Sequence, residues 1–135
     1  MTDVLASTRA TDAQIDYLQH LVDSLADLTR RGRYDMLTDP DIEFHRQLIL
    51  AAQHSRLLAA WELCAEPARA LLSVTTAVRH SLPRAAANHQ PIVDAIRNHD
   101  LGGASEAMTQ PMDRARTVML EVISGQLAID ATQTN

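Results

Sequence analysis

The sequence predicts an all-α fold, an antiparallel bundle of five to six helices around a central polar cavity. Apolar residues recur at helical spacing along every long segment, and no segment shows the alternation typical of a β-strand. Helix caps and turn residues separate these periodic segments. A length of 135 residues suits one domain with a substantial core. We place this domain at residues 11–125, after an N-terminal segment (1–10) expected to be disordered or partly ordered and before a C-terminal tail (126–135).

The first predicted helix covers residues 11–31. Thr11 or Asp12 can cap its start, because both side chains accept hydrogen bonds from free backbone N–H groups. Gly32 follows its basic end, as is common after helices. Its expected apolar face consists of Tyr17, Leu18, Leu21, Leu25 and Leu28.

Proline residues mark features of the next two predicted helices. The second helix has Asp39 as its N-cap and Pro40 in its first turn, and it continues to about Gln53. The third helix begins near Ser55 and contains Pro67, which predicts a kink or a break. Its apolar stripe consists of Leu57, Trp61, Cys64, Ala68, Leu71, Thr75 and Val78.

The last two predicted helices follow a turn at "RHSLP". Ser81 is a candidate cap for a helix over residues 83–98. Asp100 can cap the final helix, which we expect to continue to about Ser124, with Gly125 as its stop signal.

Composition excludes several classes of protein. No apolar run is long enough to cross a membrane, and the N-terminal residues do not resemble an export signal. Cys64 is the only cysteine, which excludes an internal disulfide and favours a cytoplasmic location. A formal net charge of −5, with the basic residues scattered, argues against direct binding of nucleic acid by this chain.

Three polar residues lie on helix faces that should be apolar. Asp41 and His45 are one turn apart in the middle of the stripe of the second helix, and His89 has the same position in the fourth. Because a buried ionisable group without a partner is costly, such groups usually pair or bind metal. Mixed nitrogen and oxygen ligands suit zinc, nickel, manganese or iron. Alternatively, the histidines are hydrogen-bonded core residues, and Asp41 interacts only with the helix dipole.

Two motifs give the chain a family resemblance. "DIEFHRQLILAAQHSRLLAAW" resembles the D-x-x-F-H-x-x-L-x-x-A-x-x-N-x-x-L signature of the FCD domain, the C-terminal effector-binding domain of FadR-type GntR family transcriptional regulators. "NHQPIVDAIRNHDLGGASEAM" resembles the later E-H-x-x-I-x-x-A-I-x-x-G-D-x-x-x-A motif of that family. The likeness extends over about residues 11–120.

The resemblance implies a divalent metal bound by Asp41, His45 and His89. In the family a fourth ligand, another histidine, usually comes from the last helix. Pro111 occupies that place here and cannot ligate. The site therefore either holds metal on three protein ligands or is a polar cavity without metal.

The resemblance also implies a small carboxylic-acid or sugar-acid effector, which arginine side chains help to bind. Arg69 and Arg79 are the candidates, although both are equally consistent with solvated helix-edge residues. The resemblance further implies a homodimer that reaches DNA only through a winged helix-turn-helix, and we find no such segment before residue 11.

The predicted function is therefore effector sensing and dimerisation, without catalysis. Two alternatives remain at this point. A metal with three protein ligands is also typical of a hydrolytic enzyme, although the sequence shows no fixed general acid or base beside these three residues and no nucleophile with a base at motif spacing. The chain would be a purely structural bundle if its inward polar groups only satisfy one another.

Overall fold

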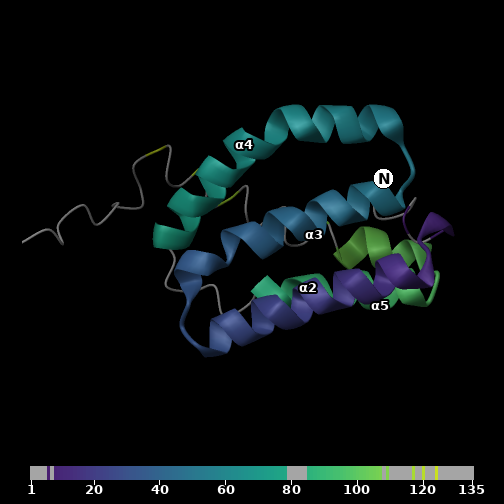
Figure 1. Cartoon of the computed structure of the whole chain (residues 1–135), viewed down its shortest axis with the longest axis horizontal. Coiled ribbons are helices and arrows are strands. Elements are labelled where there is room, and N and C mark those ends of the chain that lie inside the picture. The colour runs from purple at the N-terminus through teal and green to yellow at the C-terminus, as the bar shows by residue number, and fades with distance from the viewer. Residues whose placement is uncertain are drawn as a thin grey trace, which may run out of the picture.

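The described residues of the computed structural model form an all-α fold, which confirms the predicted class (Figure 1). The structure describes residue 6, residues 8–78 and 85–107, and positions 109, 117, 120 and 124. Residues 101–107 are helical, and no strand occurs in the described part of the chain. No helix there is long and apolar enough to cross a membrane. The other elements are α2 (Asp12–Arg30), the 3₁₀ helix η1 (Tyr34–Met36), α3 (Thr38–Ala51), α4 (Ser55–Val78) and α5 (Ala85–Arg97).

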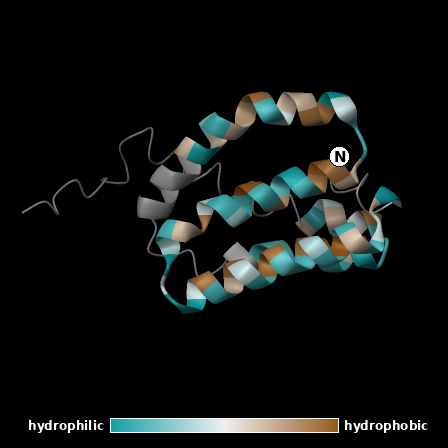
Figure 2. Cartoon of the chain, viewed as in Figure 1, coloured by the Kyte–Doolittle hydropathy of each residue, from teal (hydrophilic) through white to brown (hydrophobic). Residues whose placement is uncertain are grey.

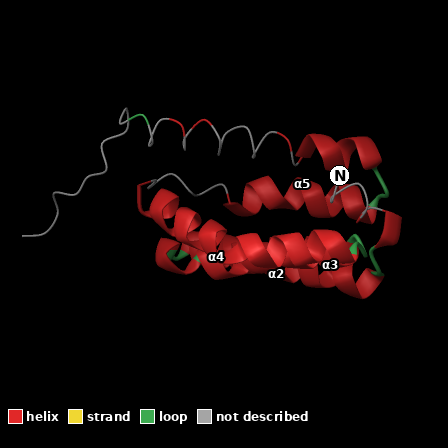
Figure 3. Cartoon of the chain, turned by 90° about the horizontal axis from the view of Figure 1, so that it is seen from above, coloured by secondary structure: helices red, strands yellow, loops and turns green. Residues whose placement is uncertain are grey.

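Helix α3 lies between α4 on one side and the pair α2 and α5 on the other (Figure 1). Helix α2 packs against both α5 and α3, whereas α4 packs mainly against α3 and η1. Seen from above, α2, α3 and α4 overlap in one row and α5 lies in another (Figure 3). The expected central polar cavity stays a prediction.

The hydrophobic core is built by α2, α3 and α5. Hydrophobic and hydrophilic residues are interspersed along each helix, as in amphipathic helices (Figure 2). Phe44 of α3 is fully buried at the centre of this core. Its other buried members are Ala6, Ile15, Leu18, Leu21, Val22, Leu48, Ala51, Ile92, Val93 and Ile96. Because these three helices share one core, the positions of α3 and α5 relative to each other are set by packing.

Helix α2 begins and ends as its sequence predicts. The Thr11 side chain accepts a hydrogen bond from the backbone N–H of Gln14, and the Gln14 side chain accepts one from Thr11 N–H, so the cap is Thr11. Gly32 follows the helix with φ of +67°, a conformation that suits glycine. The prediction that Tyr17 lies on the buried face is wrong, since Tyr17 is 41% exposed. The buried face is centred on Leu18, and Tyr17 lies about 100° away from it.

The predicted start of α3 is also wrong. The helix begins at Thr38, with Leu37 as its N-cap, so Asp39 is inside the first turn and does not cap it. The cause is η1, which the sequence did not predict and which leads directly into α3 through Leu37. Pro40 lies in the first turn as expected, where its missing N–H costs no helical hydrogen bond.

Helix α4 is one continuous helix with Pro67 inside it. A break at this proline is therefore excluded, while the ribbon of α4 changes direction along its length (Figure 1). After α5, the Asp100 carboxylate accepts a hydrogen bond from Gly103 N–H at 2.9 Å, as expected for a cap. A side chain at Gly103 would collide with that carboxylate, so the glycine makes room for the cap. Ser81 and Gly125 lie outside the described residues.

A pair of glutamines joins α2 to α5. Gln19 and Gln90 each donate to the other's side-chain oxygen at 2.8 Å. Their second amide protons go to Asp23 and Asp94, one turn further along each helix. Every donor and acceptor of both amides is therefore used. A sliding or rotation of α5 along α2 would break both central bonds, so the pair fixes the position of α5.

We predict that Gln19 and Gln90 are coupled in stability. Replacing one by Leu leaves the other amide partly buried without its partner and should cost about 1–2 kcal/mol of unfolding free energy. Replacing both should cost clearly less than the sum of the two single changes, because no amide is left unpaired. Urea unfolding of the wild type, both single variants and the double variant measures this. Additive effects would contradict it.

Candidate metal centre

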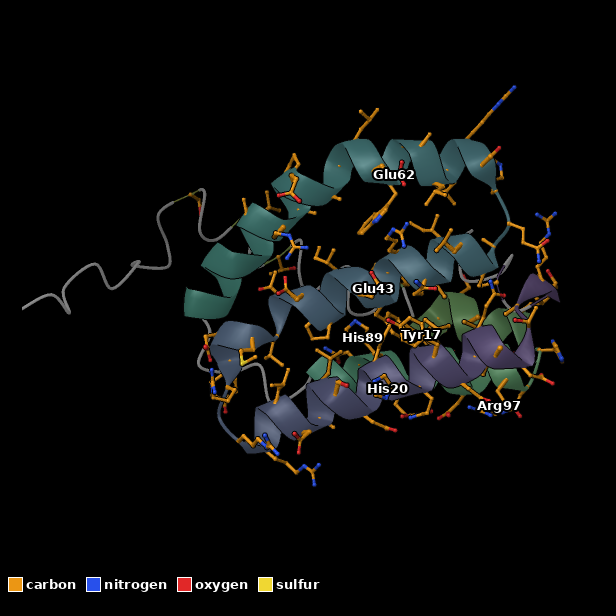
Figure 4. All side chains as sticks on the ribbon, in the orientation of Figure 1. Tyr17, His20, Glu43, Glu62, His89 and Arg97 are labelled. Atoms are coloured by element: carbon orange, nitrogen blue, oxygen red, sulfur yellow. The ribbon has the colours of Figure 1, made fainter. Side chains whose placement is uncertain are left out.

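Two helices of the core position three ionisable side chains. Asp41 and His45 lie on successive turns of α3, on a face that also carries the buried Leu48. His89 lies on α5, and Val93 and Ile96 on the same helix are fully buried. In Figure 4 the labelled His89 lies between α3 and α2.

The three side chains come together at Asp41. The Nε2 atom of His89 is 2.8 Å from Oδ1 of Asp41, a hydrogen-bond distance. The Nε2 atom of His45 is 3.9 Å from the same oxygen. The side chains of Asp41, His45 and His89 are 16%, 25% and 10% exposed, so they lie near the edge of the interior.

Aromatic rings surround the two imidazoles. The Phe44 ring meets the His89 ring edge to face at 4.6 Å between centroids, and the two imidazoles are 5.4 Å apart. Trp61 of α4 lies 6.2 Å from the His45 ring on the outer side. Phe44 therefore contacts both imidazoles, which limits the number of orientations they can adopt, and Trp61 lies beside the His45 ring alone.

Burial and neighbouring charges keep Asp41 ionised and His45 neutral near pH 7. Burial alone would raise the pKa of Asp41, but the hydrogen bond from His89 and, when the imidazoles are protonated, their positive charges lower it below its usual 3.8. Burial is the main reason that the pKa of His45 is below 6.5; Asp41 opposes this effect and His89 adds to it. An ionised carboxylate and a neutral imidazole are the forms that bind metals.

The arrangement fits a small divalent ion. Each residue offers one ligand atom, and these atoms all lie within 4.8 Å of one another. Two ligands about 2.1 Å from one tetrahedral ion are about 3.4 Å apart, so small side-chain adjustments suffice. An ion would take the place of the proton between His89 and Asp41. Among the described residues, no other cluster of this kind occurs.

The other predicted site residues have different positions. Arg69 of α4 donates to the carboxylate of Asp39, and its Nε lies 3.7 Å from Glu66. Asp39 is two residues before Asp41, so Arg69 lies beyond the N-terminal side of the three-residue cluster. Arg79 and Pro111 lie outside the described residues.

Sequence reasoning missed the roles of Trp61 and Asp39. Trp61 was placed on the apolar stripe of its helix, yet this stripe alone does not say which residue of α3 it faces. Asp39 was assigned to a cap, and the structure pairs it with Arg69, thirty residues further along the chain. The sequence did contain one signal for the position of Trp61: it is the single tryptophan of the chain, and it lies in the helix that follows the motif containing His45.

We predict a pH dependence of stability caused by His45. In metal-free protein, the unfolded His45 gains a proton as the pH falls through about 6.5, whereas the folded His45 stays neutral to lower pH. The unfolding free energy should therefore fall between about pH 7 and the folded pKa. Urea unfolding in chelator at several pH values should show a flatter dependence for His45→Gln. The exposed His20 provides the control, since His20→Gln should leave the slope unchanged. Equal slopes in both variants would refute the assignment.

Comparison with known proteins identifies the family of the chain. The family model described as the FCD domain matches residues 4–114 of the chain. No curated protein and no solved structure matches this chain. The match covers most of the sequence, including α2, α3, α4, α5 and all three residues of the cluster. The chain therefore belongs to the FCD domain family.

Proposed function

We propose that this chain is the ligand-sensing domain of a GntR/FadR-type transcriptional regulator and binds a small organic acid through a divalent metal. The observation that carries the proposal is the convergence of Asp41, His45 and His89 in a domain of the FCD family. Zinc, nickel, manganese and iron are the ions whose preferences fit two imidazoles and one carboxylate.

Three protein ligands leave coordination positions open. Pro111 stands where the family usually has a fourth ligand, so the protein side contributes one ligand fewer. A bound ion supplies positive charge and free positions for the carboxylate of an acid. Asp41, His45 and His89 hold the ion, and Phe44, which contacts both imidazole rings, keeps them in place.

Arg69 is a second anchor for the acid. Its guanidinium is engaged with Asp39 and lies close to Glu66. A carboxylate of the effector competes with Asp39 for the same guanidinium, and the planar group suits two-point binding of a carboxylate. Arg79, the other candidate, remains a prediction from the sequence.

Effector binding acts through linkage. The acid contacts both α3, which belongs to the core, and α4, which packs mainly on α3 and η1. Whichever arrangement of α4 binds the acid more tightly is stabilised by it. In a complete, cytoplasmic, homodimeric regulator this shift alters the DNA affinity of a winged helix-turn-helix. The chain itself performs no catalysis in this proposal.

The first test is metal content. Protein loaded with Zn²⁺ or Ni²⁺ and then desalted should retain about one ion per chain by elemental analysis. His45→Ala and His89→Ala should each weaken binding by at least about 100-fold, because each removes a direct ligand. His20→Ala is the control and should bind normally, since His20 is exposed and lies on α2, which contributes no residue to the cluster. Normal metal content in both ligand variants would show that the site is elsewhere.

The second test is acid binding. An acid at about 100 times its Kd should stabilise the metal-loaded protein by about 2.7 kcal/mol, a rise of several degrees in Tm. Arg69→Gln should reduce the shift, whereas Arg56→Gln, an exposed change on the same helix, should not. NMR of the acid after incubation distinguishes a sensor, which leaves it intact, from an enzyme. No shift with any acid, with or without metal, would contradict the proposal.

A further inference from the structure

We propose that the acid carries a flat aromatic group, which packs against Trp61 while its carboxylate binds at the three-residue cluster. This inference rests on the proposed function and makes its ligand class specific. It is based on the chemistry of α4, the helix that covers the outer side of Asp41 and His45.

Between Ser55 and Ala70, the partly buried side chains of α4 are mostly apolar. We call this set the inner stripe. It comprises the half-buried residues of α4 between Ser55 and Ala70, and every other residue of that range is exposed. Its members are Leu57, Leu58, Trp61, Ala65, Ala68 and Arg69. None of these residues is fully buried, so α4 covers α3 without closing against it as tightly as the core helices do.

Two contacts fix how the inner stripe lies along α3. Trp61 faces His45, and Arg69 faces Asp39, so the two helices are antiparallel. The small Ala65 therefore lies opposite the turn that carries Asp41. The side chains of His45 and Asp41 keep 25% and 16% of their surface exposed. An acid that reaches the cluster from here meets Trp61 on one side and Arg69 on the other, about 12 Å apart along the helix.

The inner stripe is poorly suited to a sugar acid. A polyhydroxylated ligand needs a hydrogen-bond partner for most of its hydroxyl groups, because burying them unpaired is costly. Of the six members only Trp61 and Arg69 have polar atoms in their side chains, and Arg69 is engaged with Asp39. A ring, in contrast, loses little by leaving water and gains contact with the indole face. An aromatic carboxylic acid thus suits both the three-residue cluster, which binds its carboxylate, and the inner stripe, which contacts its ring.

Isothermal titration calorimetry with benzoate, phenylacetate and gluconate tests the inference on the metal-loaded full chain. Benzoate or phenylacetate should bind at least about tenfold more tightly than gluconate. Trp61→Leu should weaken binding of the aromatic acid by about fivefold, the scale of one lost aromatic contact, and Trp61→Phe should restore most of it. Leu63→Ala is the matched control on the same helix. Leu63 is 83% exposed on the outer face, and its replacement should leave affinity unchanged.

The outcomes separate this inference from the proposed function. Tighter binding of gluconate, unaffected by Trp61→Leu, would overturn the aromatic class while leaving an acid sensor in place. Binding of neither class of acid would contradict both. Metal affinity of Trp61→Leu, measured in parallel, shows that the cluster is intact, because a loss of metal there would mean that Trp61 acts on the ligands of the ion and not on the acid.

Discussion

The hydrogen bond between Asp41 and His89 is the interaction on which this domain depends. It joins α3 to α5 at the edge of an apolar core, and it satisfies a carboxylate that burial would destabilise. Removal of either partner leaves the other ionisable group largely buried without its main partner. The same pair also gives the domain its chemistry, since a carboxylate and an imidazole held at this distance are close to the geometry of two ligands of one ion.

The rest of the core keeps these two groups in register. Phe44 is adjacent to His45 in the sequence, points into the core and contacts the edge of His89. Helix α2 contributes no residue to the cluster, yet it binds both helices that do, through apolar packing and through the Gln19–Gln90 pair. Because Gln90 is fixed, its neighbour His89 has little freedom to move along the axis of α5. The relative position of Asp41 and His89 is thus set by contacts that lie outside the cluster.

Helix α4 differs from the three core helices in how it is held. Its described inner residues are only half-buried, and its outer face exposes Leu63. Less buried apolar surface means weaker attachment, so α4 is held less tightly over residues 55–70 than the three core helices are. A core that holds the proposed metal ligands, covered by one less tightly held helix, is an arrangement suited to the proposed conversion of binding into movement.

The sequence by itself determined the fold class, most of the helix boundaries and the presence of three inward-facing polar groups. These features follow from local physics: the helical spacing of apolar residues, the capping side chains of Thr11 and Asp100, and the place of Asp41, His45 and His89 on those faces. The start of α3 was mispredicted because η1 precedes it and the N-cap is Leu37 rather than Asp39. The burial of Tyr17 was mispredicted because its side chain lies at the margin of the apolar face. The tertiary structure alone decided which residues from different helices meet. Periodicity gives the face of each helix but not its rotation or its shift along a neighbour, and these two quantities bring His89 to Asp41, Trp61 to His45, and Arg69 to Asp39.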